Sequence, residues 1–78
     1  MQYERIKNLR EDHDLTQQDI ANRLFINRST YSNYEMGIRN IPIEILSDLA
    51  DIFQTSVDYL IGRTDIRKPY PKKDRLRV

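Results

Sequence analysis

Residues 15–37 read LTQQDIANRLFINRSTYSNYEMG and contain two short stretches of helical periodicity separated by three residues. Thr16, with a carboxylate three positions later at Asp19, is close to the capping-box pattern that begins a helix. Asn27 is a residue type that caps a helix, and Gly37 suits the left-handed residue that ends one. The stretch therefore predicts a helix over 16–24, a turn over 25–27 and a second helix over 28–36.

The flanking sequence extends the same periodicity in both directions. Apolar residues recur at helical spacing at Ile6, Leu9, Leu46, Leu49, Ala50 and Phe53, without the two-residue alternation of strands. Pro42 suits the first position of a helix that carries Glu44 in its first turn, and Ser56 and Gly62 can begin and end a short last helix. We expect an all-α, compact five-helix domain over residues 1–64, with helices at about 2–12, 16–24, 28–36, 42–53 and 56–61.

Charge is distributed unevenly along the chain. The 78 residues carry 13 Lys/Arg and 12 Asp/Glu, a net charge of +1. Residues 1–64 contain seven basic and ten acidic side chains (net −3), whereas residues 65–78 contain six and two (net +4). Residues 65–78 also hold two prolines and too little apolar surface for another packed element, so we expect a basic, flexible C-terminal tail. This tail either attracts DNA phosphates or only keeps the chain soluble.

Composition excludes several function classes. The chain has no cysteine and one histidine, so the sequence disfavours a disulfide scaffold, a metal site and a Ser-His-Asp triad. The single histidine, His13, is expected at the end of the first helix. Its two glycines form no phosphate-binding loop. No apolar run approaches the roughly 20 residues of a membrane span. We expect a cytoplasmic protein with no cofactor, no metal, no membrane partner and no enzymatic activity.

The helix over 28–36 has two unlike faces when its residues are placed at 100° steps. One face carries Arg28, Ser29, Ser32, Asn33 and Met36, and the other carries Thr30, Tyr31, Tyr34 and Glu35. Arg and Asn side chains match guanine and adenine edges in the DNA major groove, whereas the two tyrosines are expected in the core. The alternative is a polar face that is merely solvated, although it lacks the Glu/Lys pairs usual on such a face.

Four segments, in this order, resemble the phage repressor/Cro-type helix-turn-helix family, also called the xenobiotic-response-element family. They are residues 15–21 (LTQQDIA), residues 27–37 (NRSTYSNYEMG), Pro42 with Leu46, and residues 56–62 (SVDYLIG). The resemblance covers roughly residues 3–63 and implies a five-helix, repressor-like DNA-binding domain that works as a homodimer on a palindromic operator. Phe25 departs from the family pattern, because a glycine commonly stands at the first residue of the turn.

The resemblance also implies roles for individual residues. Base readout falls to Arg28, Ser29, Ser32 and Asn33, and DNA backbone contacts fall to Gln17, Asn27, Ile38, Arg39 and Asn40. Arg10 and Glu35 occupy positions that form an ion pair in some family members. Val57, Tyr59 and Ile61 offer more apolar surface than one face of a short helix can bury, so they are the expected dimer contact.

The sequence therefore leaves two alternative functions. The first is a sequence-specific transcriptional regulator, a repressor acting on double-stranded operator DNA. The second is a protein-interaction module on the same fold, an antitoxin or adaptor with a regulatory protein partner. The acidic domain slightly favours the second function, and the Arg/Asn face favours the first.

Overall fold

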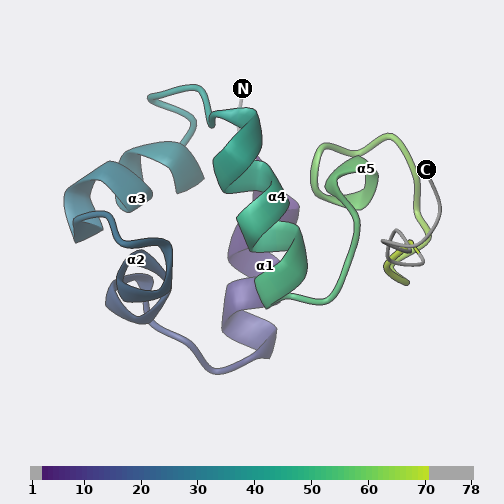
Figure 1. The fold of residues 1–78 in the computed structure, drawn as a ribbon, viewed down its shortest axis with the longest axis horizontal. Coiled ribbons are helices and arrows are strands. Elements are labelled where there is room, and N and C mark those ends of the chain that lie inside the picture. Colours follow the sequence, from purple (N-terminus) through teal and green to yellow (C-terminus); the bar gives the residue numbers. More distant parts are fainter. Residues whose placement is uncertain (1–2, 71–78) are drawn as a thin grey trace, which may run out of the picture.

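The computed structural model describes residues 3–70 of the chain. Within these residues the fold is all-helical, with five helices and no strand (Figure 1): α1 Glu4–Asp12, α2 Gln17–Leu24, α3 Arg28–Glu35, α4 Ile43–Ile52 and α5 Val57–Leu60. The predicted fold class is confirmed, and the predicted helix boundaries differ from the observed ones by one or two residues.

Side-chain caps begin three of the helices where the sequence placed them. Thr16 Oγ1 accepts the Asp19 N–H at 3.0 Å and the Asp19 carboxylate accepts the Thr16 N–H at 2.8 Å, which completes a capping box. Asn27 Oδ1 accepts the Thr30 N–H at 2.8 Å, and Ser56 Oγ accepts the Tyr59 N–H at 3.0 Å. The prediction for Pro42 is wrong by one position: its ψ of 150° is extended, so it is the N-cap and α4 begins at Ile43.

All five helices end in the same way. A residue with positive φ follows each helix, and the N–H of the next residue bonds back to a carbonyl in the last turn, as Ile26 N does to Ala21 O at 3.1 Å. The left-handed residues are Asp14, Phe25, Gly37, Gln54 and Gly62. Gly37 and Gly62 were predicted in this role, whereas three of the helices end without a glycine.

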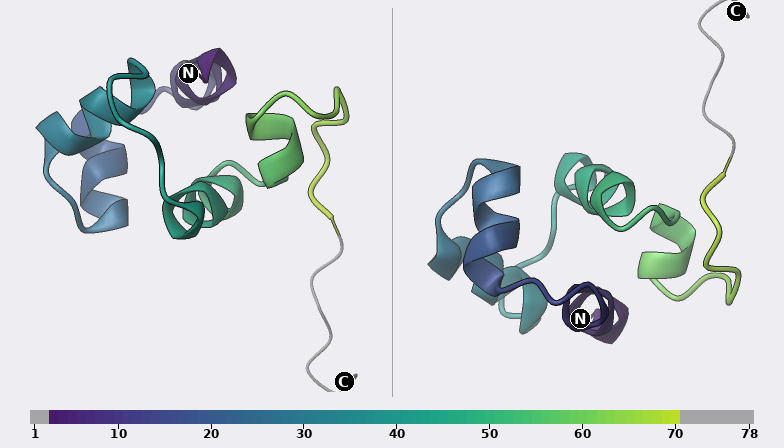
Figure 2. Two further views of the ribbon diagram at one scale, coloured as in Figure 1. Left: turned by 90° about the horizontal axis from the view of Figure 1, so that it is seen from above. Right: turned by 90° about the horizontal axis from the view of Figure 1, so that it is seen from below.

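The core is assembled from all five helices. α2 packs against α3, α4 packs against α5, and α1 contacts both α3 and α5, an arrangement that Figure 2 shows from two sides. The largest fully buried side chains are Ile6, Leu9, Ile20, Tyr31, Leu49 and Leu60. This packing places α2 and α3 on one side of the molecule and α5 on the opposite side (Figure 1).

Residues 64–70 lie against the helices, and we call them the 64–70 segment. Thr55 Oγ1 donates to Arg67 O at 2.7 Å, and Tyr70 Oη donates to Asp58 Oδ2 at 2.7 Å. Arg5 of α1 donates to Thr64 O and forms an ion pair with Asp65. The predicted basic tail thus starts with residues that contact the domain, while its residues 71–78 lie outside the described residues.

Candidate nucleic-acid interface

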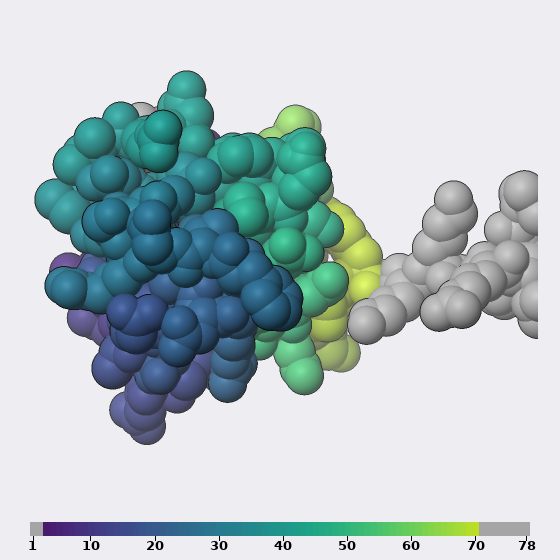
Figure 3. All heavy atoms as spheres, turned by 60° about the vertical axis from the view of Figure 1, so that its left-hand side comes forward, coloured from purple at the N-terminus to yellow at the C-terminus, as the bar shows by residue number. Residues whose placement is uncertain are grey.

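The α2–turn–α3 unit forms one face of the molecule. Figure 3 shows residues of α2, α3 and the following loop side by side on this surface. Beneath it, Ala21 and Leu24 of α2 and Tyr31 of α3 are buried in the common core. The packing fixes the rotation of α3 about its own axis, and this rotation decides which of its side chains meet solvent.

α3 presents the face that the periodicity of its sequence predicted. Tyr31 and Glu35 are buried, whereas Arg28 and Ser29 are exposed and Ser32 and Asn33 are half-buried. The Arg28 and Asn33 side chains make no hydrogen bond or ion pair with other described residues. One long cationic and one short amide side chain are therefore available to a ligand, without breaking an interaction within the domain.

The residues expected to contact the DNA backbone surround this face, but some of them already make hydrogen bonds within the domain. Asn27 Oδ1 accepts hydrogen bonds from the Thr30 N–H and from Ser29 Oγ, the latter at 3.1 Å. Of the Asn27 side-chain amide, the N–H groups therefore remain available to a ligand. Gln17 Nε2 donates to Glu35 Oε1 at 3.3 Å. Ile38, Arg39 and Asn40 are exposed in the loop after α3.

Behind α3, Arg10 and Glu35 form a bidentate ion pair. Arg10 Nε lies 2.9 Å from Glu35 Oε2 and Arg10 Nη2 lies 3.0 Å from Glu35 Oε1, and the two side chains are 12% and 4% exposed. Tyr31 Oη donates to Glu35 Oε2 at 2.6 Å, and Arg10 Nη1 donates to Leu15 O at 2.8 Å. The pair joins α1 to α3, and Gln17 adds α2.

These contacts change the acidity of the groups involved. Burial opposes the charge on Glu35, yet hydrogen bonds from Arg10, Tyr31 and Gln17 outweigh it and hold the pKa of Glu35 below its usual value. The hydrogen bond with Glu35 raises the pKa of Arg10, and burial raises the pKa of Tyr31. Glu35 is therefore a charged hydrogen-bond acceptor at neutral pH, and its partners all belong to the fold.

The net charge of the domain conceals a locally positive surface. Residues 20–43 contain Arg23, Arg28 and Arg39, all exposed, and one acid, the buried and paired Glu35. Lys7 was missed at the sequence level; it lines a hollow of about 410 Å³ beside the N-terminus of α2, where two basic and two acidic side chains meet. The hollow is lined by Glu4, Lys7, Arg10, Gln17, Glu35 and Met36. Only the packing of α1 against this unit could have revealed Lys7, because it lies ten positions from Gln17 in the chain.

The residues expected at a dimer contact lie on the far side of the molecule. Val57, Tyr59 and Ile61 are half-buried in and after α5. The Arg5 guanidinium stacks 4.3 Å from the centre of the Tyr59 ring, so part of this aromatic surface is already covered. Val57 and Ile61 are the other half-buried apolar side chains at this end of the molecule.

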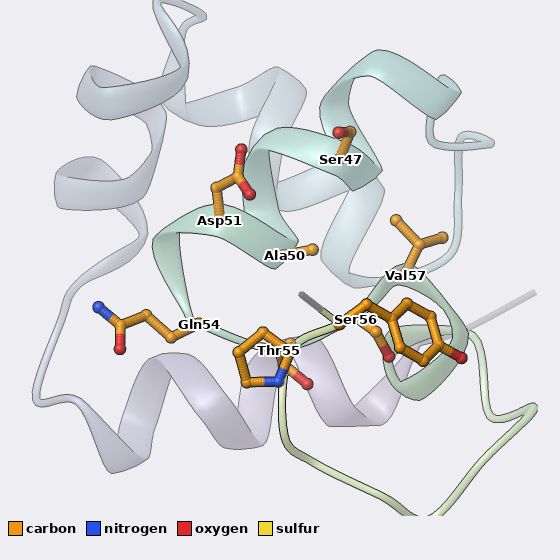
Figure 4. Close-up of a pocket in the computed structure, with 9 residues that line it drawn as sticks. Ser47, Ala50, Asp51, Gln54, Thr55, Ser56 and Val57 are labelled. Atoms are coloured by element: carbon orange, nitrogen blue, oxygen red, sulfur yellow. The ribbon is translucent and has the colours of Figure 1, made fainter. Parts of the chain in front are cut away.

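A second hollow, of about 430 Å³, lies between α4, the start of α5 and residues 69–70 (Figure 4). Among its lining residues, Asp51 is the one acid, and no histidine or cysteine is present. Across the described residues, no three His, Cys, Asp or Glu side chains gather in a group that could hold a metal ion. None of the helices over residues 3–70 is long and apolar enough to cross a membrane.

Comparison with known proteins agrees with this geometry. A family model described as helix-turn-helix matches residues 6–60. The chain is 37% identical over 75 residues to the uncharacterized HTH-type transcriptional regulator YobD of Bacillus subtilis (96% of this chain, 65% of YobD). It is 38% identical over 72 residues to the HTH-type transcriptional regulator AnsR of the same organism (92% and 62%). It is 33% identical over 64 residues to the antitoxin PezA of Streptococcus pneumoniae (82% and 40%).

The chain belongs to the phage repressor/Cro-type (xenobiotic-response-element) helix-turn-helix family. It spans less than two thirds of the length of YobD and of AnsR. The search of solved structures gave no significant match.

Proposed function

We propose that this chain is a sequence-specific DNA-binding transcriptional regulator that inserts α3 into the major groove of operator DNA. One observation carries the proposal: Arg28 is exposed and Asn33 is half-buried on α3, and neither side chain has a hydrogen-bond or ion-pair partner among the described residues. The names of YobD and AnsR as HTH-type transcriptional regulators support it.

In this proposal base and backbone contacts come from different elements. Arg28 binds a guanine and Asn33 an adenine through paired hydrogen bonds, while the short Ser29 and Ser32 side chains allow close approach. Phosphates are bound by the groups around α3: Gln17, Asn27, Lys7, and the loop of Ile38, Arg39 and Asn40. The backbone contacts orient the domain, and α3 reads the sequence.

The working form is a two-fold dimer joined through Val57 and Ile61, with Tyr59 at its edge. α5 lies on the opposite side of the molecule from α2 and α3 (Figure 1), so a dimer through α5 leaves α3 uncovered in both protomers. Half-sites are then about 34 Å apart, one turn of DNA. A dimer bound across such an operator blocks other proteins from the same DNA, and we therefore propose repression in the cytoplasm, without cofactor or catalysis.

The test is selection from a random duplex pool, followed by gel-shift titration over a salt series. The chain should enrich a palindrome, and the affinity should fall steeply with salt because phosphate contacts release counterions. Sedimentation of the complex should show two protomers per operator. Absence of any enriched sequence, together with salt-independent retention, would contradict the function; a one-to-one complex would contradict the dimer alone.

The second candidate is an antitoxin or adaptor whose main ligand is another protein. It is favoured by the net charge of −3 over residues 1–64 and by the resemblance to the antitoxin PezA. For this function, Ala substitutions at Arg28 and Asn33 leave the biological effect intact, because no base is read. For the regulator, the same substitutions abolish it.

A further inference from the structure

The turn between α2 and α3 contains a residue that is unfavourable in two independent ways. Phe25 has a φ of 58°, a left-handed conformation that residues with a Cβ rarely adopt and that bulky ones adopt least. Its side chain is also 95% exposed, so its aromatic surface gains nothing from the core. The other non-glycine residues of this conformation among residues 3–70, Asp14 and Gln54, have polar side chains that water solvates. Folding alone does not account for a phenylalanine here.

The position of Phe25 suggests where its ring is used. It stands two residues before Asn27 and three before Arg28, at the end of α3 that carries both side chains. Consecutive Cα atoms are about 3.8 Å apart, so a DNA strand contacted by Asn27 and Arg28 passes within reach of the Phe25 ring. DNA offers apolar surface there, because the faces of deoxyribose and the methyl group of thymine both carry C–H groups that a phenyl ring contacts favourably.

We propose that Phe25 makes an apolar contact with DNA, beside the backbone contact of Asn27 and the base contact of Arg28. The inference rests on the proposed DNA-binding function and adds an affinity-determining residue outside α3. The ring is buried only in the complex, so its exposure in the free protein is the expected state. The unfavourable backbone conformation is tolerated because hydrogen bonds hold the turn on both sides. The Phe25 and Ile26 N–H groups bond to carbonyls at the end of α2, and the Asn27 side chain caps α3.

Substitution at this turn should change stability and affinity in opposite directions. Phe25→Gly removes the conformational strain and leaves the core intact, so the melting temperature of the full chain should rise by about 2–6 °C. Affinity for DNA selected by the wild-type chain should nevertheless fall about five- to thirtyfold, because the ring no longer covers apolar surface of the DNA. Phe25→Tyr keeps the ring and should bind within about twofold of wild type, since ring burial is unchanged.

Gln54→Gly is the matched control, because Gln54 has the same left-handed role after α4 and lies in no proposed DNA contact. It should raise the melting temperature in the same way and leave the affinity unchanged. If Phe25→Gly binds as tightly as wild type or more tightly, or if Gln54→Gly or Phe25→Tyr weakens binding as much, the proposal is overturned. If the wild-type chain selects no sequence, the proposed function itself fails instead.

Site selection with Phe25→Gly distinguishes the two apolar groups of DNA that the ring could contact, the deoxyribose and the thymine methyl group. A decrease in affinity that is equal for all sequences assigns the ring to deoxyribose. Disappearance of a preference for thymine at one symmetric position assigns it to the methyl group. Either result supports an apolar contact by Phe25.

Discussion

Glu35 accepts hydrogen bonds from side chains of the three helices around the proposed DNA-binding face, namely Arg10 of α1, Gln17 of α2 and Tyr31 of α3. Within the described residues, every buried side-chain nitrogen and oxygen has a partner. Removing one member of this cluster leaves the others buried without hydrogen-bond partners. Breaking a buried ion pair in this way lowers the free energy of unfolding by about 3–5 kcal/mol. The same interactions join α3 to α1 and α2, so they contribute to stability and also to the orientation of the proposed recognition helix.

We therefore expect Arg10→Met and Glu35→Leu each to lower the free energy of unfolding by about 3–5 kcal/mol, because each leaves a buried polar partner without its hydrogen bonds. The double mutant should be destabilised by much less than the sum of both, since neither partner is then stranded. Urea denaturation of the four proteins gives the coupling energy. Small, equal and additive decreases would show that the pair contributes little.

The low pKa of Glu35 also predicts how stability depends on pH. A carboxyl group whose pKa is lower in the folded than in the unfolded state contributes stability above the unfolded value of about 4.3, and this stability is lost as the pH falls further. Urea denaturation between pH 7 and pH 3 should show this loss, and Glu35→Gln should show less of it. Because Asp19 also has a lowered pKa, through its hydrogen bonds with Thr16, some acid dependence should persist. Identical profiles for both proteins would exclude Glu35 as a source.

Sequence readout should be divided between Arg28 and Asn33, which stand five positions apart on α3. Arg28→Ala and Asn33→Ala should each relax the preference at a different symmetric operator position, reducing discrimination by about 1–3 kcal/mol. Site selection with each mutant measures this. If both mutants select the wild-type consensus, α3 does not read bases through these residues, and uniform weakening by Arg28→Ala would assign Arg28 to a phosphate.

At the scale of elements, Arg5 connects α1 to α5 and to the 64–70 segment. Its guanidinium stacks on the Tyr59 ring and donates to Tyr59 O at 3.0 Å, to Thr64 O and to Asp65. α5 comprises only four residues, too few to be stable alone. Its position therefore depends on packing against α4 and α1, on the hydrogen bond from Tyr70 to Asp58, and on this cation.

Arg5→Ala should accordingly loosen α5 more than the rest of the fold. We expect the Leu60 and Ile61 amides, which close α5, to exchange with solvent about tenfold faster relative to amides of α2. Asn8→Ala, an exposed position on α1, is the control and should leave both helices unchanged. Equal acceleration of α2 and α5 would indicate global destabilisation instead of a local role for Arg5.

How far the sequence predicts this structure differs from element to element. Helix starts were predictable because Thr16, Asn27 and Ser56 act on backbone groups two or three positions away. The ends of α2 and α4 were not marked, since Phe25 and Gln54 adopt a conformation for which their residue types have no preference. The contacts of Arg5 and of Tyr70 span 54 and 12 positions, and no local pattern indicates such a separation. The base and phosphate roles were predicted from the family resemblance. Periodicity alone predicted only which residues lie on each face of α3.

At the scale of the whole molecule, exposed charge differs between neighbouring stretches of the chain. The exposed charges of residues 20–43 are positive, whereas α4 carries the acids Glu44, Asp48 and Asp51 and no base. If the proposed α2–α3 face meets DNA, the exposed arginines of residues 20–43 attract the phosphates, whereas residues 1–64 as a whole carry a net charge of −3 and repel them. Such asymmetry favours correct encounters over random adsorption.

The basic residues after the 64–70 segment should then act as a separate attraction for DNA. Deleting residues 71–78 removes Lys72, Lys73, Arg75 and Arg77 but keeps the hydrogen bonds of Thr55 and Tyr70, so the melting temperature should change little. Affinity should fall for all sequences alike, and the slope of log affinity against log salt should flatten by about 0.9 for each phosphate that the chain no longer neutralises. Replacing the four residues with Gln in the full-length chain is the control for chain length and should reproduce the deletion. An unchanged affinity and slope would leave these residues with a solubilising role alone.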